Sequence, residues 1–144
     1  MRLFLVILVT LSCFAFNAQA DIINCQVGVV CDGTNGSDNI YGTGGDDIIR
    51  GFGGNDIIYG SNGHDQIDGG SGRDYIYGGS GNDTIIGGPG HDNITGGSGS
   101  DGITGNDGDD VIEGAGGNDT VDCGSGNDWV STDSETTSNC ENVF

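Results

Sequence analysis

The 144-residue sequence contains no lysine, and its three basic residues are the arginines Arg2, Arg50 and Arg73. Against them stand 22 acidic residues, all of which follow residue 20. So few cations disfavour nucleic acid and anionic membrane surfaces as partners. Apolar residues make up only 33% of the chain, and low hydrophobicity with high net charge is typical of disordered proteins. The composition therefore predicts that a hydrophobic core alone cannot stabilise a folded structure of this chain.

What the sequence does contain is an internal repeat. Residues 33–131 divide without insertion or deletion into eleven units of nine residues. Every unit has Gly at its fourth place, Asp at its sixth, and Ile or Val at its eighth. Gly also opens ten of the units, with Cys123 as the exception. Three fixed columns over eleven copies indicate one structural element that is repeated along the chain.

Each column of the repeat has a physical interpretation. Glycines at the first and fourth places favour a turn over the first six residues, because they permit a positive φ and a close approach of neighbouring backbone. The last three residues predict a very short strand whose central β-branched side chain points inward. Two units then form one coil of 18 residues with a strand on each face. The sequence therefore predicts an all-β parallel solenoid.

Such a solenoid has a thin core. One aliphatic side chain per unit contributes ~1.5–3 kcal/mol, whereas each ordered residue costs ~1–2 kcal/mol of backbone entropy. The sixth-place aspartates of alternate units stack on one edge at roughly the 4.8 Å strand spacing, and they repel unless a cation lies between them. Carboxylates with turn carbonyls suit Ca²⁺ better than Mg²⁺ or a soft metal. We therefore expect Ca²⁺ to complete the fold.

The units resemble the haemolysin-type, or RTX, calcium-binding nonapeptide G-G-x-G-x-D-x-U-x. The resemblance implies a right-handed parallel β-roll with Ca²⁺ held between successive turns by Asp carboxylates and turn carbonyls. It assigns these metal ligands: Asp38, Asp56, Asp74, Asp92, Asp110 and Asp128 on one edge, and Asp47, Asp65, Asp83, Asp101 and Asp119 on the other. About nine ions fill the roll if every gap between stacked aspartates holds one.

The segments outside the repeat have separate roles. Residues 1–20 carry one basic residue, an apolar run and the ending Ala18-Gln19-Ala20, which predicts a signal peptide rather than a membrane span. Cys13 follows a poor lipobox, which argues against a lipoprotein. Residues 21–32 form the predicted N-terminal cap of the 33–131 roll, and residues 132–144 form its C-terminal cap, within which 132–139 is expected to be a loop. After cleavage two arginines oppose 22 acidic residues, a net charge of −20 that about nine Ca²⁺ nearly neutralise.

Four cysteines follow the leader in what we expect to be an oxidising compartment. About five and a half coils, or roughly 26 Å at strand spacing, separate the first two cysteines from the last two. A disulfide requires Cα atoms within ~7 Å, so only local pairing is reachable. We therefore predict Cys25–Cys31 and Cys123–Cys140. No pair has the CxxC spacing that favours zinc.

Catalytic residue sets are missing. No Ser, His and acid combination stands outside the repeat, and no segment is large enough to build a pocket beside it. His64 and His91 are three units apart, which places them on opposite edges and prevents a shared metal. Glycine strings such as Gly51-Phe52-Gly53 precede no helical pattern, so the repeat explains them better than nucleotide binding. We predict that the protein is not an enzyme.

Two functions remain open. The first is a small secreted or periplasmic stand-alone RTX-type protein that folds on binding Ca²⁺ and serves as a structural or adhesive scaffold. The second is a module that binds a glycan or an extracellular protein, that self-associates, or that accompanies a secreted enzyme or toxin. An aromatic strip on one sheet face supports the second function, although we favour its interpretation as a stabilising ladder between neighbouring strands. Its residues are Tyr41, Ile57, Tyr59, Tyr75 and Tyr77.

Overall fold

The computed structural model describes residues 20–131 and 136–143, so nearly all of the predicted signal peptide lies outside the described residues. The described residues form strands connected by turns, with no helix. The strands are β1 (Ile22–Asn24), β2 (Cys31–Asp32), β3 (Asn39–Tyr41), β4 (Ile48–Arg50), β5 (Ile57–Asn62), β6 (Gln66–Asp68), β7 (Tyr75–Ser80), β8 (Thr84–Ile86), β9 (Asn93–Ser98), β10 (Gly102–Asp107), β11 (Val111–Gly116), β12 (Thr120–Ser125), β13 (Trp129–Val130), β14 (Thr136–Ser138) and β15 (Asn142–Val143).

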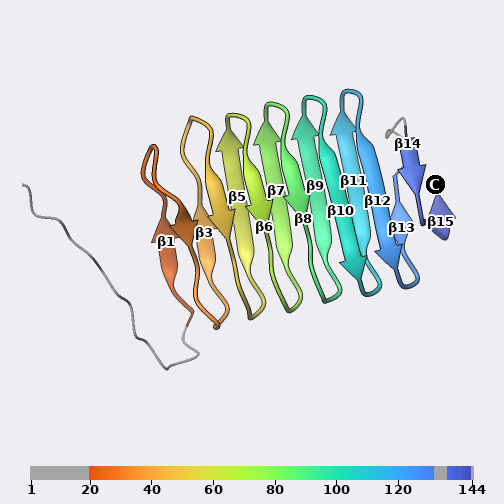
Figure 1. The fold of residues 1–144 in the computed structure, drawn as a ribbon, viewed down its shortest axis with the longest axis horizontal. Coiled ribbons are helices and arrows are strands. Elements are labelled where there is room, and N and C mark those ends of the chain that lie inside the picture. Colours follow the sequence, from red (N-terminus) through yellow and green to blue (C-terminus); the bar gives the residue numbers. More distant parts are fainter. Residues whose placement is uncertain (1–19, 132–135, 144) are drawn as a thin grey trace, which may run out of the picture.

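The strands build two parallel sheets that face each other along a rod (Figure 1). Odd-numbered strands form an eight-stranded sheet, and even-numbered strands form a seven-stranded sheet, each in sequence order. Within the repeat the paired residues are 18 apart, as in Ile40 with Ile58 and Ile58 with Ile76. One coil therefore contains two units, and the predicted fold class, an all-β parallel β-roll with disulfides, is confirmed.

The core is a single column of aliphatic side chains between the sheets. All eleven eighth-place residues, from Ile40 to Val130, are at most 3% exposed. Their neighbours at the seventh and ninth places alternate outward, as in the exposed, buried, exposed pattern of β4 and β8. The side-chain period of two in a strand produces this alternation. The core therefore has the predicted composition of one aliphatic residue per unit.

The turns are shorter than the sequence predicts. Six strands (β5, β7, β9, β10, β11 and β12) are six residues long and continue through the first three places of the next unit. In these coils the prediction of a six-residue turn is wrong. The added residues pair with the neighbouring coil, as Ser61 does with Gly79, because stacked identical units offer backbone partners at every place.

The ends of the rod continue both sheets. In the predicted N-terminal cap, β1 pairs with β3 and β2 pairs with β4. At the C-terminus, β14 pairs with β12 and β15 pairs with β13. Part of the expected loop at 132–139 is therefore a strand, and that prediction is wrong for Thr136–Ser138, whose threonines suit a strand added to an exposed sheet edge.

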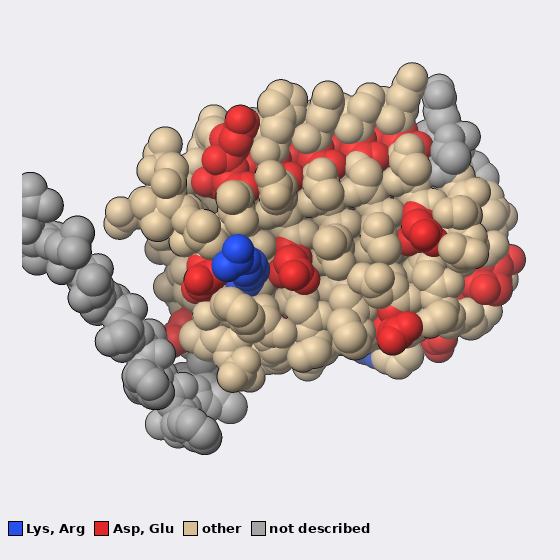
Figure 2. Space-filling view, viewed as in Figure 1, with Lys and Arg blue, Asp and Glu red and all other residues tan. Residues whose placement is uncertain are grey.

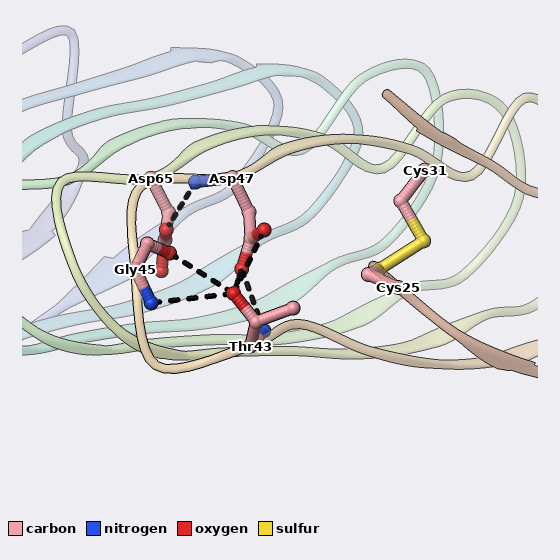
Figure 3. Close-up of a disulfide and its surroundings, with 6 residues drawn as sticks. All are labelled: Cys25, Cys31, Thr43, Gly45, Asp47 and Asp65. Atoms are coloured by element: carbon pink, nitrogen blue, oxygen red, sulfur yellow. Dashed lines mark hydrogen bonds between the residues drawn. A yellow bond between two sulfur atoms is a disulfide. The ribbon is translucent and has the colours of Figure 1, made fainter. Parts of the chain in front are cut away.

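Two disulfides lie at the two ends of the roll. Cys25 and Cys31 are joined with their Cα atoms 5.3 Å apart (Figure 3). Cys123 and Cys140 are joined with theirs 5.2 Å apart. Cys31 and Cys123 are buried in the core column, whereas Cys25 and Cys140 pack against it from the ends. Each bond thus attaches a terminal segment to the aliphatic core. Nothing in the described residues resembles a membrane-spanning helix.

Candidate metal centre

The predicted ligands form two stacks of buried aspartates, one along each edge of the roll. All eleven sixth-place aspartates are at most 3% exposed, although carboxylates are rarely buried without a partner. The side chains come from equivalent turns because the 18-residue register places every second unit in line. Figure 2 shows a row of acidic atoms along the upper rim of one face.

Each stack carries a continuous ladder of hydrogen bonds. The backbone N–H of one aspartate donates to Oδ1 of the aspartate 18 residues later, at 2.8–2.9 Å in all nine pairs. At the C-terminal end the N–H of Asp128 donates to Oε2 of Glu141 at 3.1 Å, so a glutamate continues the ladder there. The ladder fixes the orientation of the nine carboxylates from Asp56 to Asp128, but it uses only one of the two oxygens of each.

Within the described residues, the second oxygens of these nine carboxylates, Oδ2, are buried without the hydrogen bonds that such atoms normally make. Nine Oδ2 atoms are buried without a hydrogen-bond partner among the described residues: those of Asp56, Asp65, Asp74, Asp83, Asp92, Asp101, Asp110, Asp119 and Asp128. An unsatisfied buried polar atom costs ~1–3 kcal/mol, and more when it is charged. Nine in one small domain indicate a missing cationic partner.

A backbone oxygen joins each of seven of these carboxylates. A Cβ added to Gly69 would lie 2.7 Å from Oδ2 of Asp74 and 2.7 Å from the carbonyl oxygen of Gly87, which belongs to the next coil. The same pair, the unit's own Oδ2 and the first-place carbonyl of the following coil, lies within 3.0 Å of a Cβ added to each of seven first-place glycines. They are Gly51, Gly60, Gly69, Gly78, Gly87, Gly96 and Gly105. We call each such place a glycine cradle.

Burial shifts the acidity of the stacked carboxyls. Desolvation raises the pKa of Asp56 from 3.8 to about 7, against the backbone hydrogen bond from Asp38, which lowers it. Desolvation likewise raises the pKa of Asp65 to about 6 and that of Asp92 to about 7. Neighbouring aspartates of the stack add repulsion in the same direction. Without a cation, the folded roll therefore favours protonated carboxyls.

The donor set fits a hard divalent cation. Each cradle brings together a carboxylate oxygen and a backbone carbonyl oxygen, with the next aspartate of the stack one coil away. Ca²⁺ takes 6–8 oxygens of these kinds in flexible geometry. No described group of three or more His, Cys, Asp or Glu side chains converges on a point. The candidate ligands among the described residues are therefore aspartates and backbone oxygens, none of which is a soft ligand for a thiophilic metal.

Comparison with protein families decides the assignment. The model of the RTX calcium-binding nonapeptide repeat matches residues 32–67, 68–103 and 95–130. The chain belongs to the RTX calcium-binding nonapeptide repeat family. No curated protein and no solved structure matches it. RTX membership supports Ca²⁺ binding by the repeats, and proteins of this family are typically extracellular and non-catalytic. The disulfides agree with an oxidising compartment.

The structure also reveals a second ladder that the sequence analysis missed. The fifth-place backbone N–H donates to the fifth-place side chain of the preceding coil, as His64 N does to Asp46 Oδ1 and Asn82 N to His64 Nδ1, both at 2.8 Å. His91 Nδ1 accepts from Asp109 N in the same way. The signal was present, because every fifth place except Arg73 holds Ser, Asp, Asn or His. These residue types all supply an acceptor.

The five residues of the predicted aromatic strip, Tyr41, Ile57, Tyr59, Tyr75 and Tyr77, lie on the outside of the eight-stranded sheet. Tyr41, Tyr59 and Tyr77 occupy aligned positions on β3, β5 and β7, and each is at least 40% exposed. The rings of Tyr41 and Tyr59 stack with centroids 5.4 Å apart and an interplanar angle of 7°. Tyr75 is 52% exposed and Ile57 is 37% exposed. The five predicted residues therefore share one surface.

Proposed function

We propose that this RTX chain is a secreted, non-enzymatic scaffold that folds when Ca²⁺ fills the gaps between its stacked aspartates. The observation that carries the proposal is the set of nine buried Oδ2 atoms that have no hydrogen-bond partner among the described residues. Calcium supplies their missing contact and opposes the repulsion within each stack. About nine Ca²⁺ bring roughly +18 to a chain whose net charge without residues 1–20 is −20.

Binding and folding form one equilibrium in this proposal. The unfolded chain holds its aspartates far apart in water, so a site exists only after two coils have stacked. The aliphatic column is too thin to stack them alone, because each coil of 18 residues buries two aliphatic side chains. We expect folding at roughly 10⁻⁴–10⁻³ M Ca²⁺, the range of extracellular calcium modules. Such a rod would be rigid outside the cell and disordered where calcium is scarce.

The test is replacement of one stacked aspartate against an exposed acidic residue. Asp74→Asn keeps the size of the side chain and an Oδ1 acceptor for Asp56 N, but removes the negative charge from two gaps. We expect the number of bound Ca²⁺ to fall by at least one and the calcium midpoint of folding to rise. Glu113→Gln, on the exposed face of β11, is the control and should change neither. Equal behaviour of the two variants in calorimetric titration would refute the stacked sites.

The exposed tyrosines favour a second function, recognition of a glycan or an extracellular protein. A shallow groove of about 180 Å³ runs beside them, with Tyr59, Tyr77, Asn93 and Thr95 among its lining residues. Aromatic faces beside amide and hydroxyl groups suit a sugar ring. The double replacement Tyr59→Ser with Tyr77→Ser separates the two interpretations. Unchanged folding with lost glycan retention or self-association indicates a binding surface, whereas a shifted calcium midpoint alone indicates a structural ladder.

A further inference from the structure

In the first coil of the RTX roll, threonines donate hydrogen bonds to the second oxygen of each stacked carboxylate. Thr34 donates to Oδ2 of Asp38 twice, from its backbone nitrogen at 2.7 Å and from its hydroxyl at 2.9 Å. Thr43 makes the same two bonds to Oδ2 of Asp47, at 2.6 and 3.0 Å. Figure 3 shows the Thr43 hydroxyl between Gly45 and the Asp47 carboxylate. Asp38 and Asp47 are therefore the two stacked aspartates absent from the set of unpartnered Oδ2 atoms.

The backbone conformation of the second place explains the difference. In the nine later units this residue has a positive φ, between 70° and 119°. It is Phe52, Ser61, Gly70, Gly79, Gly88, Gly97, Asn106, Ala115 or Gly124. Thr34 and Thr43 are not left-handed, in keeping with the strong disfavour of β-branched residues for positive φ. In the nine left-handed units no second-place N–H or hydroxyl bonds the aspartate, and these same nine units hold the unpartnered oxygens.

Thr34 and Thr43 lie beside the first-coil positions that correspond to the seven glycine cradles. We call those seven cradles open, because no threonine bonds the Oδ2 atom in them. A Cβ added to Gly33 would lie 3.1 Å from Oδ2 of Asp38 and 2.6 Å from the carbonyl oxygen of Gly51. A Cβ added to Gly42 would lie 3.0 Å from Oδ2 of Asp47 and 2.2 Å from the carbonyl oxygen of Gly60. Carboxylate and carbonyl thus meet in the first coil as they do elsewhere, but there the Oδ2 lone pairs already accept two hydrogen bonds.

We propose that Thr34 and Thr43 are metal-free caps that close the first gap of each aspartate stack, so that the calcium array begins at Asp56 and Asp65. This inference rests on the proposed calcium scaffold and refines its ion count. Of the nine gaps between consecutive aspartates, two are closed by threonine and seven coincide with open cradles. The N-terminal coil, which has only the short strands β1 and β2 before it, is thereby held by hydrogen bonds that do not depend on calcium.

The experiment counts bound Ca²⁺ in the secreted chain by equilibrium dialysis and by native mass spectrometry. Thr34→Gly with Thr43→Gly removes both hydroxyls and permits the left-handed turn that the later units adopt, so the double variant should bind two more ions than the wild type. Thr34→Val with Thr43→Val is the matched control, since valine keeps the backbone N–H bond and disfavours a positive φ. It should bind no additional ion, and two added ions would overturn the role assigned to the turn conformation. A glycine variant that folds and binds no additional ion would also overturn the proposal.

A second pair of variants keeps the proposal testable if the glycine variant does not fold. Asp38→Asn with Asp47→Asn alters only the capped carboxylates and should leave the ion count unchanged. Loss of two ions in this variant would show that the first gaps hold metal and would overturn the caps while leaving the scaffold standing. A wild-type chain that binds no calcium would instead refute the scaffold, and the caps with it.

Discussion

Replacing the glycine of one cradle with alanine is expected to lower the stability of the RTX roll and to remove one bound Ca²⁺. In Gly69→Ala the new Cβ lies 2.7 Å from Oδ2 of Asp74, 2.7 Å from the carbonyl oxygen of Gly87 and 2.9 Å from Cδ1 of Ile76. The carbonyl is backbone within the stacked coils, and the Asp74 carboxylate is fixed by the hydrogen bond from Asp56 N at 2.8 Å. Neither oxygen can withdraw cheaply. The methyl therefore overpacks the site and displaces the two atoms that would face the ion.

The expected magnitude follows from overpacking and from the number of ions coupled to folding. Overpacking of a filled site costs about 1–3 kcal/mol. Shared among about seven cooperatively bound ions, a loss of about 2 kcal/mol amounts to about 0.3 kcal/mol per ion. Because 1.4 kcal/mol corresponds to a tenfold change in one binding constant, the calcium midpoint of folding rises only about 1.6-fold. The sharper readouts are therefore stability at fixed calcium and the ion count, which should fall by one.

The matched control for this prediction is Gly102→Ala. An added Cβ there has a single neighbour, the carbonyl oxygen of Asp83 at 4.0 Å, and the residue has no left-handed φ. Removing glycine at such a place leaves stability unchanged or raises it, because the unfolded chain loses conformational freedom. Thermal unfolding in 5 mM Ca²⁺ and calorimetric counting of ions provide the assay. Equal unfolding temperatures and ion counts for the two variants would refute the interpretation of the cradles as metal sites.

Three further predictions concern pH, the second ladder and the end clamps. Burial raises the pKa of Asp56 and Asp92 from 3.8 to about 7, so their contribution to the stability of the calcium-free fold is complete below about pH 4 and is lost as pH rises through 7. Circular dichroism in excess chelator should therefore show strand signal gained on acidification, and an unchanged spectrum would contradict this. His64→Leu removes an acceptor and should destabilise the calcium-bound roll by ~1 kcal/mol in denaturant titration, whereas His64→Asn should restore most of the loss, and equal losses would argue against the ladder. Replacing Cys123 and Cys140 with alanine should cost ~2–4 kcal/mol in the same assay, and no change would show that the C-terminal clamp is dispensable.

The period of the sequence predicted the parts of the structure that repeat. An 18-residue coil places every Asp of one edge in line and every Ile or Val in the interior, and the structure has both columns. The rod length likewise left only local cysteine pairs within reach, and these are the disulfides that the structure contains. Such features follow from translation of one unit, so no knowledge of side-chain contacts was needed.

Features that depend on differences between units could not be predicted in this way. Thr34 and Thr43 differ from later second-place residues in a φ angle, which the column pattern does not encode. The fifth place looked variable because its acceptors differ in residue type, although Asp46, His64 and Asn82 perform the same task. Strand β14 departs from the nine-residue pattern altogether, and it forms because the last coil presents an open sheet edge.

Calcium-induced folding is the central claim, and a calcium titration of the chain without residues 1–20 tests it most directly. The titration starts in excess chelator and follows the radius of gyration by small-angle X-ray scattering, with far-UV circular dichroism on the same samples. We predict a disordered chain of about 36 Å that collapses cooperatively toward the roughly 14 Å of a compact domain, with strand signal appearing at the same calcium concentration. A compact chain with the same strand signal in chelator and in calcium would contradict the claim.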